Sequence, residues 1–386
     1  MVIPSSSEML AQLIATPSIS SVNPAFDSSN LAVIERLAEW AEALGFVCQI
    51  MPLPDDPGKA NLVATLGDGE GGLVLSGHSD TVPCDPDKWR GDPFVARFEE
   101  GRVYGLGSCD MKGFFVAALC AAQRFSATKL TAPLHIVATA DEESTMNGAK
   151  QLVRDDLLQA RYAVIGEPTG LTPIRLHKGI TMQQLRIVGR SGHSSDPALG
   201  RSALEGMTAA MNMLMAWRSE IQQRFPHGGF EVPFPTLNLG HIRGGDNPNR
   251  ICGDCTLHFD LRSVPQMAWS QLEGELRGRL DEALAGRELS WSLESLDVEV
   301  PPFETAADAA LVRCVEALSG QPSRSVAFAS EAPFFQQAGL ETVLLGPGDI
   351  AVAHRPEENL ALAELERADK LLEQLIHRVC VVGSLN

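Results

Sequence analysis

Aromatic residues are scarce in this chain, and basic residues are outnumbered by acidic ones. Aromatic side chains make up 6% of the 386 residues, and 31 Lys and Arg are set against 49 Asp and Glu, for a formal net charge of −18. Such a surface disfavours nucleic acid and anionic membranes as partners, and it favours the approach of metal cations and basic substrates. A role of the charge in solubility alone would explain it equally well.

Long apolar runs and a secreted cysteine pattern are also missing. No apolar stretch approaches the roughly 18 residues of a membrane helix, and residues 1–7 have neither the basic region nor the apolar core of a signal peptide. The eight cysteines are too dispersed for a disulfide framework. Cys252 and Cys255 have zinc-knuckle spacing, but no matching second pair lies nearby, so we expect no metal there. We predict a cytoplasmic protein with reduced thiols.

Four apolar segments end in a small residue that is followed by a side chain able to bind metal. They are 73–77 before His78 and Asp80, 134–139 before Asp141, Glu142 and Glu143, 162–166 before Glu167, and 342–348 before His354. Because strands alternate with helical segments, we predict a mainly parallel α/β sheet, in which ligands gather at the carboxyl ends of the strands. We therefore expect a shared sheet edge for His78, Asp110, Glu142, Glu143, Glu167 and His354.

Asp110 has two simpler interpretations. It precedes a predicted helix over 114–124 and could be its N-cap. Gly105-Leu106-Gly107 before it is typical of the start of a dinucleotide-binding turn, but the third glycine is missing, and the Asp110 carboxylate would face the pyrophosphate with like charge. We therefore expect no dinucleotide cofactor.

Residues 179–293 break the alternation of strands and helices. A strand, a helix, two strands, a helix and a strand are predicted at 180–189, 202–225, 236–242, 251–261, 267–284 and 289–296. This β-α-β-β-α-β order is typical of a compact two-layer, ferredoxin-like α+β module. We predict an α/β catalytic domain formed by 1–178 and 294–386, with 179–293 inserted as a dimerisation or lid domain. The free edge of its sheet could pair with a second copy, which predicts a homodimer.

Two His, one Asp and two Glu are a suitable ligand set for two adjacent zinc ions. Imidazole and carboxylate both suit Zn²⁺, and a shared Asp can bridge two metals about 3.5–4 Å apart. One carboxylate of the Glu142–Glu143 pair would then be spare, in the position where a general base belongs.

With these motifs the chain resembles the co-catalytic zinc aminoacylase and carboxypeptidase family over essentially its whole length. The matching stretches are 14–20, 77–83, 104–107, 138–143, 166–169, 191–197, 235–242, 249–252, 331–334 and 345–348. The last four are similar to the family members that deacetylate N2-acetylornithine in arginine biosynthesis. Sister activities stay open, namely desuccinylation of succinyl-diaminopimelate, deacetylation of acetylcitrulline or dipeptide hydrolysis, as does a non-catalytic binding protein on the same fold.

The resemblance implies two zinc ions per chain, which cobalt could replace. His78 and Glu167 would hold one ion, Glu143 and His354 the other, and Asp110 would bridge them. The substrate would be a small N-acyl amino acid.

Three catalytic roles are also implied by the resemblance. Asp80 would orient His78, and Glu142 would take a proton from water and later protonate the leaving amine. His193, on the inserted domain, would stabilise the oxyanion and would reach the neighbouring subunit of the dimer. A histidine in a Gly-Ser loop could also be merely solvated.

Substrate contacts follow from the same resemblance. Lys178, Asn249 and Arg262 would hold the substrate carboxylate, although Arg262 could equally form a structural ion pair with Asp260. Glu331 would receive the cationic end of ornithine.

Overall fold

The computed structural model describes residues 3–385, apart from the side chains of residues 297 and 298. The chain divides into two compact units, which we call the first and the second unit. The first comprises residues up to 175, 305–324 and those from 330 onwards, and the second comprises 176–304 and 325–329. The second unit extends past the predicted 179–293 because its last long strand runs on to Val300.

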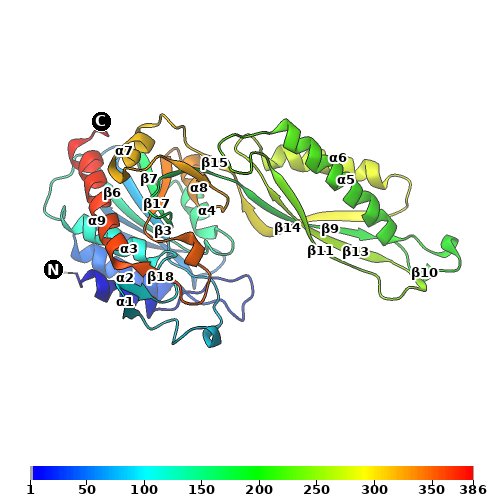
Figure 1. Cartoon of the computed structure of the whole chain (residues 1–386), viewed down its shortest axis with the longest axis horizontal. Coiled ribbons are helices and arrows are strands. Elements are labelled where there is room, and N and C mark those ends of the chain that lie inside the picture. Colours follow the sequence, from blue (N-terminus) through cyan, green and yellow to red (C-terminus); the bar gives the residue numbers. More distant parts are fainter. Residues whose placement is uncertain (1–2, 386) are drawn as a thin grey trace. The chain divides into compact units, whose positions relative to one another are not determined.

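A large sheet forms the centre of the first unit (Figure 1). Its strand order is β1 (Val47–Pro52), β2 (Ala60–Leu66), β6 (Leu134–Thr139), β3 (Leu73–His78), β7 (Tyr162–Pro168), β17 (Glu341–Gly346), β8 (Ile174–His177) and β15 (Phe303–Glu304), with β16 (Arg324–Val326) beside β8. Strand β15 and the ends of β8 and β16 consist of residues that are counted with the second unit. The central strands β6, β3, β7 and β17 are parallel, and the flanking strands pair antiparallel. Every residue of β3, β6 and β7 is buried, as expected for parallel strands covered on both faces.

Helices cover this sheet. They are α1 (Ser6–Ile14), α2 (Leu31–Ala43), α3 (Lys112–Gln123), α4 (Asn147–Arg154), α7 (Ala310–Ser319), α8 (Ala332–Gln337) and α9 (Leu362–Ile376), with short helical turns at η1 (Pro86–Lys88), η3 (Ile350–Val352) and η4 (His377–Val382). Helix α3 is apolar on nearly all sides and packs closely on β7. A Cβ atom at Gly166 would lie 2.0 Å from Cγ of Phe114, so glycine is required beside the helix.

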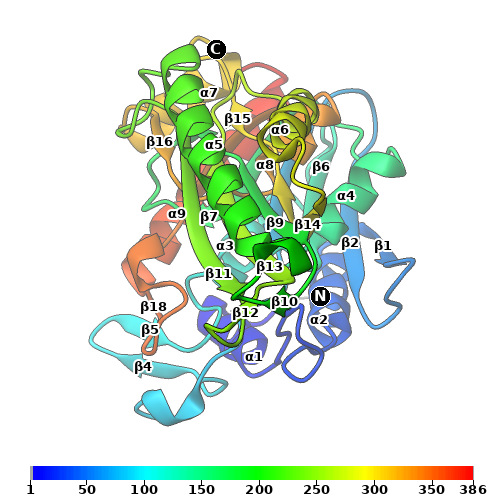
Figure 2. The same cartoon turned by 90° about the vertical axis from the view of Figure 1, so that its right-hand side faces the viewer.

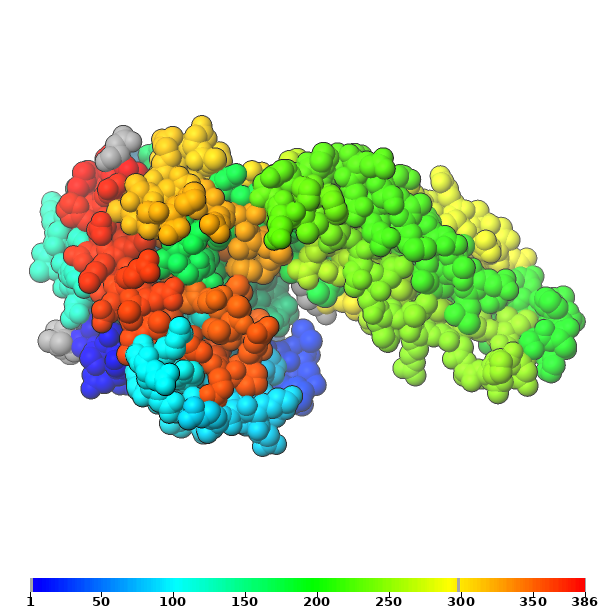
Figure 3. Space-filling model, viewed as in Figure 1, coloured from blue at the N-terminus to red at the C-terminus, as the bar shows by residue number. Residues whose placement is uncertain are grey.

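A small antiparallel sheet joins two distant parts of the first unit. Its strands are β4 (Arg97–Glu99), β5 (Arg102–Tyr104) and β18 (Asn359–Ala361). Figures 2 and 3 show the cyan segment around β5 beside the orange segment around β18. This pairing, which the sequence did not indicate, brings the segment before α3 close to the segment that carries His354.

The second unit is a two-layer α+β structure. Its antiparallel sheet has the order β11 (Thr236–Gly244), β13 (Asp254–Arg262), β9 (Ile180–Val188) and β14 (Ser290–Val300), and α5 (Ala203–Arg224) and α6 (Trp269–Leu284) lie on one face. Leu214 and Trp217 of α5 and Leu276 of α6 share a core with Leu185 and Leu257 of the sheet. Separately, β10 (Gly192–His193) pairs with β12 (Arg250–Ile251), and η2 (Pro197–Leu199) follows β10.

The predicted fold class is confirmed. A mainly parallel α/β sheet is interrupted by a region with the predicted β-α-β-β-α-β order, if the short β10, η2 and β12 are set aside. A role of this region in dimerisation stays a prediction. Among the described residues, none of the helices is both long and apolar enough to cross a membrane.

Candidate metal centre and catalytic site

Five predicted ligands meet at the carboxyl edge of the central strands. The possible ligand atoms of His78, Asp110 and Glu167 lie within 4.8 Å of one another, and so do those of Asp110, Glu143 and His354. Asp110 belongs to both groups, as expected of a carboxylate shared between two metal ions.

His78 is the last residue of β3 and is buried. Its Nδ1 lies 3.0 Å from the backbone carbonyl oxygen of Asp80, which can only accept, so Nδ1 carries a proton. Nε2 faces Asp110 and is the nitrogen that would bind a metal ion. The Asp80 carboxylate is 3.8 Å from Nδ1. The hydrogen bond that orients His78 is therefore donated to the backbone carbonyl of Asp80, and the Asp80 carboxylate lies farther away.

The Asp80 carboxylate has a different task. It accepts hydrogen bonds from the backbone N–H groups of Glu142 at 3.3 Å and Glu143 at 3.1 Å. Burial raises the pKa of Asp80, and the positive charge on His78 and these N–H groups act in the opposite direction. These hydrogen bonds fix the backbone from which the side chains of Glu142 and Glu143 extend.

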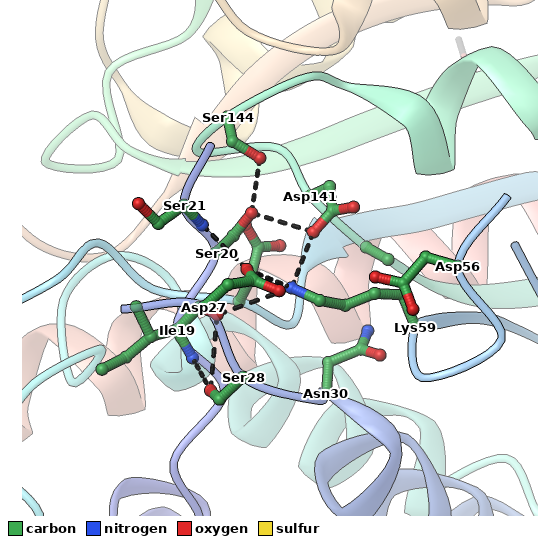
Figure 4. A network of polar contacts seen from close by, with 12 residues as sticks. Ile19, Ser20, Ser21, Asp27, Ser28, Asn30, Asp56, Lys59, Asp141 and Ser144 are labelled. Atoms are coloured by element: carbon green, nitrogen blue, oxygen red, sulfur yellow. Dashed lines mark hydrogen bonds and ion pairs between the residues drawn. The ribbon is translucent and has the colours of Figure 1, made fainter. Parts of the chain in front are cut away.

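Asp141 anchors the same turn from its other side, as Figure 4 shows. Its backbone has a φ of 59°, in the left-handed region that Asp tolerates better than most residues. The carboxylate oxygen Oδ1 accepts hydrogen bonds from Nζ of Lys59 at 2.9 Å and Oγ of Ser20 at 2.8 Å. Lys59 also donates to Asp27 at 2.8 Å. The segment that carries Glu142 is thus held at two places. Asp80 binds the backbone N–H groups of Glu142 and Glu143, and Lys59 and Ser20 bind the Asp141 carboxylate.

Asp110 is not a helix cap. Helix α3 begins at Lys112, and its N-cap position is Met111, which makes no side-chain capping bond. The Asp110 carboxylate instead faces two imidazoles, with Oδ1 3.0 Å from Nε2 of His78 and Oδ2 3.3 Å from Nε2 of His354. Burial alone would raise the pKa of Asp110, but the hydrogen bonds from His354 and His78 hold it below its usual range.

The remaining carboxylates are crowded and short of positive charge. Burial raises the pKa of Glu143, and it raises those of Glu142 and Glu167 well above the usual range. Hydrogen bonds to Asp110 and Glu143 raise the pKa of His354 to about 10, so positive charge is favoured between these two carboxylates. Divalent cations would supply that charge, and a donor set of imidazole nitrogen and carboxylate oxygen suits Zn²⁺. The residues present therefore fit a two-metal site.

Comparison with known proteins agrees with this geometry. The family model described as Peptidase family M20/M25/M40 matches residues 74–378. An acetylornithine deacetylase of Pasteurella multocida (strain Pm70) is 45% identical over 381 residues, which cover 98% of this chain and 99% of that protein. The chain belongs to the M20/M25/M40 peptidase family. It is accordingly a metal-dependent hydrolase.

Solved structures of other family members share the fold. An M20 family metallo-carboxypeptidase from Sulfolobus solfataricus has a TM-score of 0.74 at 17% identity, with 97% of this chain and 99% of that chain covered. The Bacillus subtilis YXEP protein, described as a dinuclear metal-binding peptidase of the M20 family, has a TM-score of 0.68 at 13% identity, with 96% of each chain covered. At these identities the likeness concerns the fold alone.

Glu142 differs from the adjacent Glu143 in its position relative to the predicted metal ligands. Its carboxylate forms a group with His78 and Glu143 but belongs to neither of the groups that contain Asp110. It therefore lies at the edge of the two-metal arrangement, where a proton acceptor can face a reacting water.

Glu331 is fully buried in the first unit. Its Oε2 accepts a hydrogen bond from Oγ1 of Thr139 at 2.9 Å, and its Oε1 has no hydrogen-bond partner among the described residues. Burial raises the pKa of Glu331 to about 7. The predicted contact with the cationic end of ornithine stays a prediction.

The predicted carboxylate-binding residues divide into two places within the second unit. Lys178 and Arg262 line one pocket of about 510 Å³ together with Phe230 and Thr236. Arg262 also forms the alternative ion pair, with its Nε 2.8 Å from Asp260. Both cationic groups are thus partly engaged by protein atoms. Arg262 pairs with Asp260, and Nζ of Lys178 donates a hydrogen bond to the Phe234 carbonyl at 2.7 Å.

Asn249 lies elsewhere in that unit, beside His193. The backbone carbonyl of Asn249 accepts a hydrogen bond from the N–H of Ser194 at 3.0 Å, and His193 is exposed, with Nδ1 2.7 Å from Oγ of Ser195. Arg262 is the last residue of β13, whereas Asn249 comes before Asp254, the first residue of that strand. The length of β13 therefore separates Asn249 from Arg262. Asn249 therefore groups with His193 and apart from Arg262.

Two buried charged residues of the site were missed from the sequence, Lys59 and Glu358. Lys59 contacts Asp141 across 82 positions of sequence, and Glu358 accepts backbone hydrogen bonds from the loop that carries Asp110. Each looks like an ordinary solvated residue in the sequence, because its partners are distant. Only the neighbouring motifs, Gly58-Lys59 before a strand and Glu358 shortly after His354, give any local signal.

Proposed function

We propose that this chain is a dizinc amidohydrolase that converts N2-acetyl-L-ornithine to L-ornithine and acetate in arginine biosynthesis. The observation that carries the proposal is the pair of ligand groups that share Asp110, with Glu142 beside them. The choice of substrate is supported by the 45% identical relative, which is named for this reaction and matches over nearly its full length. We further propose a cytoplasmic homodimer in which cobalt can replace zinc.

Five residues would hold the metal ions. His78 and Glu167 would bind one zinc ion, Glu143 and His354 the second, and Asp110 both. When bound, the ions supply Lewis-acid polarisation of the acyl carbonyl and lower the pKa of water.

Glu142 holds and moves the proton of the reaction. Its carboxylate accepts a proton from water as the water oxygen bonds to the acetyl carbonyl carbon. Glu142 then returns that proton to the amine nitrogen as the C–N bond breaks, so that acetate and the free amine leave. The hydrogen bonds that the backbone N–H groups of Glu142 and Glu143 donate to Asp80 support this role, because they hold the segment that carries the Glu142 carboxylate through both proton transfers.

His193 stabilises the oxyanion that forms on the carbonyl oxygen. In this proposal it is supplied by the neighbouring subunit of the homodimer, and its imidazole donates a hydrogen bond to the developing negative charge. The exposed position of His193 on the β10–β12 ribbon is consistent with a contact outside its own unit.

Charged groups select the substrate. Lys178 and Arg262 line a common pocket and suit the α-carboxylate, with Arg offering the two parallel donors that a carboxylate accepts. Asn249 lies beside His193 and apart from Arg262, so in this proposal it would complete these contacts from the neighbouring subunit, together with His193. Glu331 would favour a cationic side chain such as that of ornithine.

The test combines metal content with a panel of substrates. Purified protein is subjected to elemental analysis, and amine release is measured with N2-acetylornithine, succinyl-diaminopimelate, acetylcitrulline and a dipeptide, with Glu142→Ala as the control for contaminating hydrolases. We expect two metal ions per chain and the highest kcat/KM with N2-acetylornithine. An equal or higher kcat/KM with another member of the panel would assign that sister activity, and full turnover without bound metal would overturn the dizinc mechanism.

A further inference from the structure

Glu358 is a buried carboxylate on which the backbone of a ligand-bearing loop converges. It is 1% exposed. Its Oε1 accepts hydrogen bonds from the N–H groups of Cys109 at 2.9 Å and Asp110 at 3.0 Å, and its Oε2 accepts one from the N–H of Gly107 at 3.2 Å. Neighbouring N–H groups directed at one anion form a backbone nest. Here the anion is part of the protein itself.

The same residue also belongs to the segment that carries His354. The backbone carbonyl of Glu358 accepts a hydrogen bond from the N–H of Gly105 at 3.1 Å, and the next residue, Asn359, begins β18 opposite Tyr104 of β5. Glu358 therefore contacts the loop before α3 through both its side chain and its backbone.

The His354 segment needs such support. His354 and Glu357 have φ values of 57° and 65°, a region that side chains other than glycine rarely adopt and that persists only where surrounding contacts impose it. Nε2 of His354 nevertheless lies 2.9 Å from Glu143 and 3.3 Å from Asp110. These distances depend on the two segments being held together.

We propose that Glu358 is a positioning residue for the two-metal site. By binding three amides of the Gly107–Asp110 loop, it fixes Asp110 relative to His354 at the separation that two metal ions require. The inference rests on the proposed metal site. It adds that the affinity for metal depends on a carboxylate that touches no metal.

The substitution Glu358→Gln separates this role from mere space-filling. Glutamine has the same shape, but it offers one acceptor oxygen and one NH₂ group, so at least one of the three N–H groups would face another donor. It also lacks the charge that strengthens hydrogen bonds to a carboxylate. Loss of a residue that orients metal ligands typically costs about 10–100-fold in metal affinity, and we expect a loss in this range.

The experiment compares Glu358→Gln with Glu357→Gln. Glu357 is the matched control, because its carboxylate accepts a hydrogen bond from the backbone N–H of Arg90 and pairs with Arg97, away from the ligand loop. Metal-free proteins are checked for folding by circular dichroism and titrated with Zn²⁺ in competition with a chromophoric chelator. Hydrogen–deuterium exchange of the amides at 107–110 is measured in the same metal-free samples.

We expect wild type and Glu357→Gln to bind two zinc ions with equal affinity, and folded Glu358→Gln to bind them about 10–100-fold more weakly, with faster exchange at 107–110. Wild-type affinity in folded Glu358→Gln would overturn the inference. If that variant does not fold, Glu358→Asp, which keeps the charge but shortens the reach, is titrated instead, and wild-type affinity there would overturn it equally. Failure of the wild type to bind two ions would refute the proposed function instead.

Discussion

Replacing Lys59 with methionine should lower the free energy of unfolding of the first unit by about 3–5 kcal/mol. The Lys59 side chain is 2% exposed, and its Nζ lies 2.8 Å from Asp27 and 2.9 Å from Asp141 (Figure 4). Methionine fills similar space without charge, so both carboxylates lose their cation. Removal of one partner from a buried ion pair typically costs about 3–5 kcal/mol, because the remaining charge is left uncompensated.

The two carboxylates do not share this cost equally. The Asp141 side chain is 12% exposed and that of Asp27 is 25% exposed, so Asp27 can recover more hydration. Most of the penalty should therefore come from Asp141. Adding Asp141→Asn to Lys59→Met should restore part of the stability, because Asn is neutral and also tolerates the left-handed backbone. We expect a coupling free energy of about 1–3 kcal/mol between the two positions.

Urea unfolding of the metal-free proteins, followed by circular dichroism, measures these differences. Bound metal is removed because it would add stability of its own. Burial opposes the charge on Lys59, but the hydrogen bonds that it donates to Asp27 and Asp141 raise the pKa of its ammonium group above the usual 10.5. A raised pKa means that the contribution is fully present below the unfolded-state value and is lost as pH rises through the folded-state value.

The stability gap between wild type and Lys59→Met should therefore be constant from neutral pH to about pH 9 and should shrink above about pH 10.5. A loss below about 1 kcal/mol at neutral pH would refute the reasoning, since that is the range of an exposed ion pair. A double variant no more stable than Lys59→Met would refute the assignment of the cost to Asp141.

Three further predictions address the reaction and the second unit. Glu142→Ala should keep its metal and lose about 10²–10⁴ in kcat, whereas Glu143→Ala should lose metal; elemental analysis with kinetics checks both, and the reverse result would contradict the assigned roles. His193→Ala should lose about 10²–10³ in kcat with metal unchanged. Mixing it with Glu142→Ala should restore up to about a quarter of wild-type activity by random pairing, and verified subunit exchange without recovery would exclude action across the dimer. Burial lowers the pKa of His177 to about 4, so the unfolded state binds the extra proton and wild-type stability should fall by about 3 kcal/mol between pH 6.5 and 4. His177→Phe should lack that slope in urea titrations, and an unchanged slope would show that another group causes it.

Long, regularly patterned elements were predictable from the sequence. The strand predicted at 134–139 is β6 (Leu134–Thr139), because an apolar run ends at a change to acidic residues. Strand β9 (Ile180–Val188) alternates between buried and less buried positions, which is the period that a sheet covered on one face requires. The sheet of β4, β5 and β18 was not predictable, since strands of three residues carry no period and β18 pairs with a segment about 250 positions earlier.

The approach of the five predicted ligands was also predictable, although their role stays a prediction. It follows from one rule, that the carboxyl ends of parallel strands share an edge. The fine contacts do not follow from it. Whether the carbonyl or the carboxylate of Asp80 faces Nδ1 of His78 depends on the turn after β3, and the sequence could not separate capping from ligation at Asp110, because both need a carboxylate before a helix.

Two carboxylates that are not among the predicted metal ligands, those of Asp80 and Glu358, hold two acidic loops in place without contacting the side-chain oxygens of those loops. Asp80 accepts the N–H groups of Glu142 and Glu143, and Glu358 accepts those of Cys109 and Asp110. In both cases the contact is with the backbone. The side-chain oxygens of the loop residues therefore stay available for other partners, whereas a direct hydrogen bond to them would compete with a metal ion for the same lone pairs. Fixing the backbone also limits how far crowded carboxylates can move apart to relieve their repulsion, so the repulsion is left for bound cations to offset.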